Sequence, residues 1–393
     1  MYFKGIQEIE KQLDPLNMKI LMAMWKFGPR NLLEVSRRTD LPFTTVYHRV
    51  HKLEAKSKRI VYLLPSTNKL GLVRVIAPVA ARPGYEEQVT RALKIPNLWS
   101  AINRCEGSFT HYSSHSVPLL SVSDFKRYIT HLSMSGLITN FKFIATTDLI
   151  PNFPDFRYYN SDEKHWSFKW KQWARDLRRI TPSVIDDPED YRLEADYRDL
   201  LIIKELWKNG RKTFAELAPI LGISLQAVKY RYDRLVRIGA IKHFQFDVWR
   251  FPVEISAYHE VMLQFTSKEA MNAFFALTPE LMFVYSVAKV IGENSLMVRT
   301  YLPESQVANM FGFFSELAKA GFLASYSSVR LNFAQRELQS ISYELFQDGK
   351  GWSFNLDESL SELSRLVPQR IPVEMLERIN RTADQGTFES ALR

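Results

Sequence analysis

Two stretches of the sequence, residues 42–60 and 225–242, concentrate basic side chains on what their spacing predicts to be a helix. Each holds five basic residues against one acid, Glu54 in the first stretch and Asp233 in the second. Arginine and lysine bind phosphates and guanine edges, and polar side chains near a helix N-terminus can reach bases or phosphates. The residues expected to contact nucleic acid are Thr44, Thr45, Tyr47, His48, Arg49, Lys52, Lys56, Arg59, Gln226, Lys229, Tyr230, Arg231, Arg234, Arg237 and Lys242.

The same basic faces have a second interpretation, in which they are solvated surfaces of a module that contacts proteins of the transcription machinery. The occurrence of two equivalent basic helices and a net charge of +9 favour DNA over this alternative.

A histidine pair offers the other possible chemistry. His111 and His115 lie four residues apart on a predicted strand, hence on one face, with Arg104 nearby. They could move protons or hold a carboxylate, but a metal would need a third ligand, and none is found locally. The sequence contains no Gly-x-x-x-x-Gly-Lys loop, Gly-x-Ser-x-Gly elbow or Gly-x-Gly-x-x-Gly motif. We therefore expect no enzyme activity, no cofactor and no metal site.

The elements that position the basic stretches are helix-turn-helix units. In the first unit, Asp14-Pro15 predicts a helix start, Gly28-Pro29 a stop, and residues 39–42 a turn before the third helix. In the second unit, Gly222 permits the turn and Ser224 caps the third helix. A β-hairpin wing is expected after each third helix.

An internal repeat connects the two units. Trp25–Gly28 resembles Trp207–Gly210 at an offset of 182, Gly107 pairs with Gly292 at 185, and the stretches 162–168 and 348–354 match at 186. Collinear blocks with slowly drifting offsets predict a tandem duplication of about 13–173 and 194–360.

After each wing the pattern is strand, helix, two strands, helix, strand, the ferredoxin-like order. The predicted fold class is α+β, with two copies of a winged helix-turn-helix plus a ferredoxin-like βαββαβ (RAM-like) sandwich. Trp166-Ser-Phe168 and Trp352-Ser-Phe354 predict an extra strand that packs aromatic side chains onto each sheet. The expected domains are a first winged helix-turn-helix (1–69), a first sandwich (70–177), a linker (178–192), a second winged helix-turn-helix (193–250), a second sandwich (251–356) and a polar tail (357–393), in which Leu360, Leu363 and Leu366 have helical spacing.

A winged helix joined to a β-α-β-β-α-β domain resembles the Lrp/AsnC (feast/famine) family of prokaryotic transcription regulators. The resemblance implies double-stranded DNA as partner, dimerisation through the sandwich sheets and, for a duplicated chain, a fused pseudo-dimer. The family's effector loop has a Gly-x-x-Asp-like turn, whereas the turns here begin Gly107-Ser108 and Gly292-Glu293 and lack the aspartate. These four residues are the candidate effector-binding positions, and the effector itself is unknown. Siroheme decarboxylases share the two-part architecture, which makes such an enzyme the remaining alternative.

The whole-chain composition is that of an ordinary globular protein. Of 393 residues, 46% are hydrophobic and 24% charged, and the pI is about 9.3. The single cysteine, Cys105, excludes an internal disulfide and indicates a reducing compartment. The polar N-terminus and the absence of long apolar stretches predict no signal peptide and no membrane span, so we expect a cytoplasmic protein.

Overall fold

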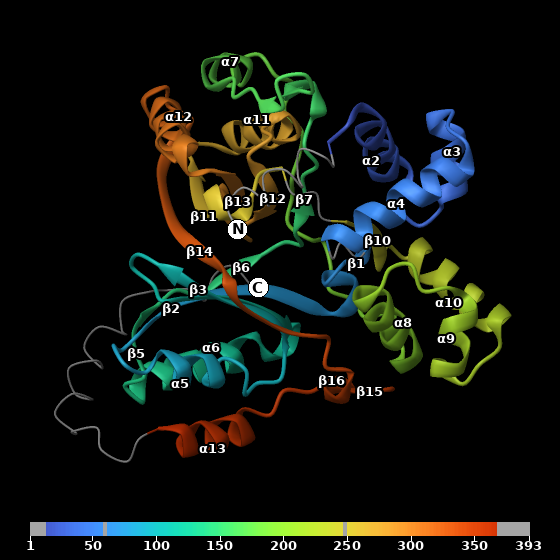
Figure 1. Cartoon of the computed structure of the whole chain (residues 1–393). Coiled ribbons are helices and arrows are strands. Elements are labelled where there is room, and N and C mark those ends of the chain that lie inside the picture. The colour runs from blue at the N-terminus through green and yellow to red at the C-terminus, as the bar shows by residue number, and fades with distance from the viewer. Residues whose placement is uncertain (1–12, 58–60, 247–249, 368–393) are drawn as a thin grey trace.

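The structure is a computed structural model that describes residues 13–57, 61–246 and 250–367 (Figure 1). We call residues 13–177 the first half and residues 194–367 the second half. Two groups of three helices lie on one side of the molecule, beside a larger body of β-sheet covered by helices (Figure 1).

The first helical group has the predicted order. The side chain of Asp14 accepts a hydrogen bond from the backbone N of Asn17 at 2.8 Å and begins the first helix, and Asp40 turns the chain with φ of 51°. Apolar side chains at helical spacing, including Ile20, Val46 and Val50, are buried between the helices. The helices are α2 (Pro15–Phe27), α3 (Leu32–Thr39) and α4 (Phe43–Ser57).

The second helical group repeats this arrangement. Gly222 takes the left-handed conformation with φ of 63°, which ends the second helix, and the Ser224 hydroxyl accepts a hydrogen bond from the backbone N of Ala227. The predicted turn and cap are both confirmed. The helices are α8 (Tyr197–Lys208), α9 (Phe214–Leu221) and α10 (Leu225–Arg237).

The expected hairpin wings are wrong for the described residues. A single strand follows each third helix, β1 (Tyr62–Pro65) and β10 (Ile241–Gln245), and the two strands pair with each other in antiparallel register. Each strand therefore satisfies its backbone hydrogen bonds from the other half of the chain. We call this two-stranded sheet the ribbon.

Each half then follows the predicted β-α-β-β-α-β order, and its four main strands are arranged with the first and third strands in the middle. In the first half the elements are β2 (Leu72–Ala81), α5 (Glu86–Ala92), β3 (Trp99–Glu106), β4 (His111–Pro118), α6 (Val122–Met134), β5 (Ile138–Phe141) and β6 (Ile144–Thr146). In the second half they are β11 (Ser256–Phe265), α11 (Lys268–Leu277), β12 (Val284–Lys289), β13 (Ser295–Pro303), α12 (Val307–Lys319) and β14 (Leu323–Gln339).

The two halves share one ten-stranded sheet. The long strand β14 pairs with β11 of its own half and continues to pair with β3 of the first half. In return β7 (Ile150–Pro151) of the first half pairs with β12 of the second. The helices lie on the outer faces, so the sheet surfaces of the two halves turn toward each other (Figure 1).

The segment after each main sheet crosses to the other half. Short hairpins, β8 (Tyr159–Asn160) with β9 (His165–Trp166) and β15 (Phe346–Gln347) with β16 (Gly351–Trp352), pair internally and not with the main sheet. The predicted extra strand on each sheet is therefore wrong. The indole of Trp166 donates to the Arg250 carbonyl, and that of Trp352 donates to the Leu70 carbonyl.

Helices continue this exchange. The helix α7 (Trp170–Asp176) of the first half packs against α12 of the second half. The helix α13 (Leu356–Leu366) of the second half packs against α6 and α5 of the first half, and its Leu356 and Leu363 are buried in that core. The helical spacing in the predicted tail is thus confirmed, whereas residues 368–393 lie outside the described part. The segment 178–192 contains no helix or strand, buries Ile185 and pairs Asp187 with Lys289 at 2.5 Å. Within the described residues no helix is long and apolar enough to cross a membrane.

Candidate functional site

The exposed faces of α4 and α10 carry most of the predicted DNA-contacting side chains. Tyr47 is 42% exposed and Tyr230 is 66% exposed, so both rings are accessible to a partner. The exposed lysines and arginines of the predicted set are Lys52, Lys229, Arg237 and Lys242, and none of these four forms an ion pair with any residue in the described ranges. The exposed members of the predicted set are Thr44, Tyr47, His48, Lys52, Gln226, Lys229, Tyr230, Arg237 and Lys242, with Thr45 partly covered.

Three arginines of the predicted set turn inward instead. Arg49 pairs with Asp14 at 2.8 Å and donates to Asn17 at 3.0 Å. Arg231 repeats this with Asp196 at 2.7 Å and Asp199 at 2.9 Å.

Arg234 also pairs with Asp199, whose carboxylate is fully buried. These arginines hold each third helix against the start of the first helix. The side chain of Lys56, and Arg59 entirely, lie outside the described residues.

The two helical groups contact each other directly. The Arg30 guanidinium donates to the Lys212 carbonyl at 2.8 Å and lies over the rings of Phe214, Tyr232 and Phe244. Reciprocally, Arg211 pairs with Glu54 and donates to the Pro29 carbonyl. These contacts fix the relative orientation of the groups that carry α4 and α10.

Gly210 brings the second helical group close to the ribbon. Its backbone N donates to the Val61 carbonyl at 2.6 Å, and a Cβ at this position would lie 2.9 Å from that oxygen and from the Phe244 ring. Only glycine permits this approach.

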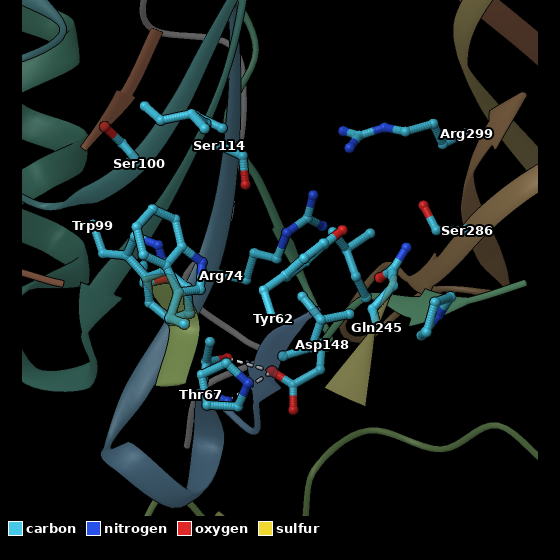
Figure 2. A pocket seen from close by; sticks show the side chains of 18 of the residues that line it. Tyr62, Thr67, Arg74, Trp99, Ser100, Ser114, Asp148, Gln245, Ser286 and Arg299 are labelled. Atoms are coloured by element: carbon cyan, nitrogen blue, oxygen red, sulfur yellow. Dashed lines mark hydrogen bonds between the residues drawn. The ribbon is translucent and has the colours of Figure 1, made fainter. Parts of the chain in front are cut away.

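A cavity of about 400 Å³ lies between the ribbon and the facing sheets (Figure 2). Arg74 on β2 and Arg299 on β13 are buried and extend into it from different halves (Figure 2). Arg74 donates to the Thr146 hydroxyl at 2.8 Å, and Arg299 pairs with buried Glu260 at 2.7 Å. Burial lowers the pKa of Arg74.

Sequence reasoning did not find this cavity. The sequence did contain an indication of a buried polar site, because Arg74 interrupts the apolar stretch Leu72–Ala81. A charged side chain in a buried strand is costly unless a partner or ligand binds it. The partners that complete the cavity come from the other half and are not visible in sequence spacing.

The histidine pair lies on one face of β4, as predicted, and that face is covered by helices. Arg104 donates to Nε2 of His111 at 3.1 Å, and Thr90 of α5 lies at 2.9 Å from the same atom. The His115 ring packs 4.8 Å from Phe125 of α6. Burial lowers the pKa of His111 to about 4 and that of His115 to about 3. Neither ring lines the cavity, and the described residues contain no cluster of three potential metal ligands.

The two turns proposed for an effector differ in their surroundings. Gly107 and Ser108 form an exposed turn, and a Cβ at Gly107 would meet no atom within 4 Å outside its chain neighbours. At the second turn, the backbone N of Gly292 donates to the linker carboxylate of Asp187, and Glu293 accepts from Ser295. The linker therefore occupies one of the two positions.

Comparison with known proteins identifies the helical region. A model of the winged helix-turn-helix DNA-binding family matches residues 196–242, from the cap of α8 into β10. An uncharacterised HTH-type transcriptional regulator of Pyrococcus horikoshii is 30% identical over 114 residues, 28% of this chain and 74% of the relative. A similar regulator of Pyrococcus abyssi is 32% identical over 117 residues, 29% of this chain and 74% of that protein. This chain belongs to the Lrp/AsnC family of helix-turn-helix transcription regulators.

The Lrp/AsnC regulator also has the overall fold of a solved enzyme. A crystal structure of a siroheme decarboxylase in complex with an iron-uroporphyrin III analogue superimposes with a TM-score of 0.52 over 90% of this chain and 100% of that one. The sequence identity is 10%, so the likeness concerns the fold alone. Membership of the Lrp/AsnC family, in contrast, supports a DNA-binding regulator.

Proposed function

We propose that the chain is a sequence-specific, double-stranded-DNA-binding regulator that arose by tandem duplication, and that its two helix-turn-helix units act as a pseudo-dimer. The observation that carries the proposal is the pair of equivalent exposed faces on α4 and α10. Each face combines polar and aromatic side chains near the helix N-terminus with a lysine, Lys52 or Lys229, that has no ion pair in the described part of the chain, the chemistry that reads base edges and phosphates.

The duplicated organisation supports the pseudo-dimer. Each half gives the other a strand of the ribbon, a strand of the large sheet and a terminal helix. Such reciprocal exchange is what a two-fold dimer of a single-copy regulator would contain after fusion. On this proposal the domains are residues 1–69, 70–177, 178–192, 193–250, 251–356 and 357–393, and the chain works in the cytoplasm without a catalytic role.

The DNA-contacting set follows from exposure. We assign base or phosphate contacts to Thr44, Thr45, Tyr47, His48, Lys52, Gln226, Lys229, Tyr230, Arg237 and Lys242, with Lys56 and Arg59 as further phosphate contacts. Arg49, Arg231 and Arg234 instead position the helices that carry these residues. A further homodimer through the sandwich surfaces remains part of the proposal, as does an effector at the exposed Gly107-Ser108 turn.

The test is recovery of bound genomic fragments. Purified protein is mixed with sheared DNA of its source at moderate salt, and retained fragments are sequenced. Enrichment of sites that share a motif supports the proposal. Retention of all fragments alike, lost with rising salt, indicates non-specific binding and contradicts sequence-specific regulation. No retention favours the protein-contact module, and an absorption change on mixing with micromolar siroheme favours the decarboxylase-like alternative.

The contribution of the helices is tested separately with Lys52→Ala plus Lys229→Ala. The matched control is Lys319→Ala, an exposed lysine on α12, at the far side of the sheet body from the helical groups (Figure 1). The double variant is expected to lose about two counterions from the salt dependence, roughly one per phosphate contact, and the control none.

A further inference from the structure

The central cavity contains a buried cation, Arg74, that forms no ion pair with a described residue, although Glu260 and Asp148 lie close enough to favour its charge. Arg74 is 6% exposed, and within the described ranges no carboxylate lies at ion-pair distance from it. Asp148 also lines the cavity, but its carboxylate already accepts hydrogen bonds from Ser66 and Thr67. A buried guanidinium that no carboxylate contacts is costly, and a carboxylate that binds its planar fork removes much of that cost.

Further polar groups face the same space from the second half. Arg299 binds Glu260 through Nε, and its guanidinium points toward the middle of the pocket (Figure 2). The hydroxyl of Ser286 is buried, has no hydrogen-bond partner in the described residues and lies beside it (Figure 2). Arg336, which is exposed, adds a cation on β14 where the cavity meets solvent.

These groups are not products of the repeat. The register of the paired strands shows that Arg74 corresponds to Tyr258, Arg299 to Ser114 and Ser286 to Ala101. Each half therefore supplies a different part of one asymmetric polar site, and neither half contains the set by itself.

The opposite end of the cavity is aromatic. Trp99 lies there, away from Arg299 and Ser286, with Arg74 between them (Figure 2). The Trp207 ring meets Trp99 edge to face at 6.1 Å. A volume of about 400 Å³ is in the range of sites for single small molecules. The lining thus suits a flat apolar body joined to an anionic group.

The cavity also touches the elements that carry the DNA-facing helices. Tyr62 and Leu64 of β1 and Gln245 of β10 form part of its wall, and these strands follow α4 and α10 in the chain. A ligand that contacts the ribbon can therefore change the relative orientation of the two helical groups.

We propose that the cavity binds a small organic anion with a flat, apolar body and a carboxylate, held by Arg74 and Arg299, and that its occupancy controls DNA binding. The first part is independent of the proposed function, whereas the regulatory part depends on it. The site is distinct from the turns at Gly107 and Gly292, which do not line the cavity.

Binding is tested on the full chain without DNA. Isothermal titration calorimetry is run with 3-phenylpropionate and indole-3-acetate, and with the corresponding amides as uncharged matches. We expect the acids to bind at least about tenfold more tightly than the amides, and Arg74→Gln to lose about tenfold or more. Lys319→Gln, away from the cavity, is the control and should bind as the parent protein does.

Arg336→Gln, at the exposed rim, covers the case in which Arg74→Gln does not fold, and should weaken binding about threefold. Failure of both acids to bind at millimolar concentration overturns the proposal. Equal affinity for acids and amides, or a folded Arg74→Gln that binds as well as the parent protein, also overturns it.

The regulatory part is tested on a DNA site recovered as above. A change of about fivefold or more in DNA affinity on saturation with an acid supports it. Unchanged DNA affinity with a bound acid overturns control by the cavity, while the ligand site stands. If the acids bind and the protein recognises no DNA, the proposed function has failed and the site again stands.

Discussion

Arg231 is a basic residue on α10 that forms ion pairs within the protein. Arg231→Gln removes the ion pairs with Asp196 and with the fully buried Asp199. We expect the free energy of unfolding to fall by about 1–3 kcal/mol, because hydrogen bonds to charged groups are lost and a buried carboxylate loses a partner. Urea unfolding measures this loss, and the salt dependence of DNA binding by the folded variant should not change.

Lys229→Gln, two positions away, is the matched comparison. Its side chain is exposed and has no ion pair in the described part of the chain. The free energy of unfolding should stay within about 0.5 kcal/mol, while the slope of log affinity against log salt falls by about one. The reverse pattern, with Arg231 changing the slope and Lys229 the stability, would contradict our division of the basic residues.

His115 predicts a pH dependence of stability. Burial lowers its pKa in the folded protein to about 3, below the unfolded value of about 6.5, so the folded state binds fewer protons. The contribution of His115 to the free energy of unfolding is fully present above pH 6.5 and is lost as the pH falls from 6.5 toward 3. Between pH 6.5 and 5 the loss from this residue is about 1.5 kcal/mol. Replacement by phenylalanine should make the pH profile measured by urea unfolding less steep by that amount, while His111 and His259, whose pKa burial lowers to about 4, keep their own contributions.

His131 on α6, which is only partly buried, is the control for this experiment. His131→Gln should keep the parent slope. If His115→Phe and the parent protein lose stability equally between pH 6.5 and 5, the buried ring is not the source of the acid sensitivity.

At the residue scale the sequence predicted the exposed polar and basic side chains, but it did not predict that some arginines form ion pairs within the protein. Arg49 and Lys52 lie in the same basic stretch, and nothing in the neighbouring residues distinguishes the paired arginine from the exposed lysine. The repeat held the missing signal: Asp14 and Arg49 recur as Asp196 and Arg231 at the same offset of 182. An acid and a base that recur together 35 positions apart indicate a structural pair.

At the scale of elements, α13 offers a test of the exchange between halves. Leu363 belongs to the second half but is buried at 3% exposure against the sandwich of the first. Leu363→Ala should cost about 2–5 kcal/mol, since it leaves a cavity under the helix. Hydrogen exchange should show reduced protection of α6, residues 122–134, in the first half.

Leu120→Ala is the matched truncation, because this leucine is 93% exposed. It should change the free energy of unfolding by less than about 0.5 kcal/mol. Loss of protection confined to the second half in Leu363→Ala would contradict the crossed position of α13.

Helices were the elements that the sequence predicted best. Their caps and 3.6-residue spacing are local properties, visible at Asp14, Gly222 and Ser224. The wing prediction failed because strand pairing is non-local. Nothing in Tyr62–Pro65 says whether its partner is a neighbouring strand or, as observed, Ile241–Gln245, almost 180 residues along the chain.

For the whole molecule, two sandwiches were predictable from their alternation of strands and helices, but their union into one sheet was not. The charged and apolar lining of the cavity exists only because β2 and β13 face each other from different halves. A cavity that forms between two folded units is not visible in the sequence of either unit. The sequence shows only a charged residue, Arg74, within an apolar strand.

The proposed pseudo-dimer leads to the last prediction. The first turns of the two third helices differ, with Thr44-Thr45-Val46-Tyr47-His48 in α4 and Gln226-Ala227-Val228-Lys229-Tyr230 in α10. A single chain should therefore bind an asymmetric site with two unlike half-sites, at one chain per site. Replacing residues 44–48 by the sequence of 226–230 keeps the buried valine and should convert the recovered motif into two similar half-sites in mirrored order. Selection from random DNA reads the motif, and mass photometry of the complex counts the chains. An unchanged motif would show that α4 does not read DNA, and two chains per asymmetric site would show that one chain is only half of the reading unit.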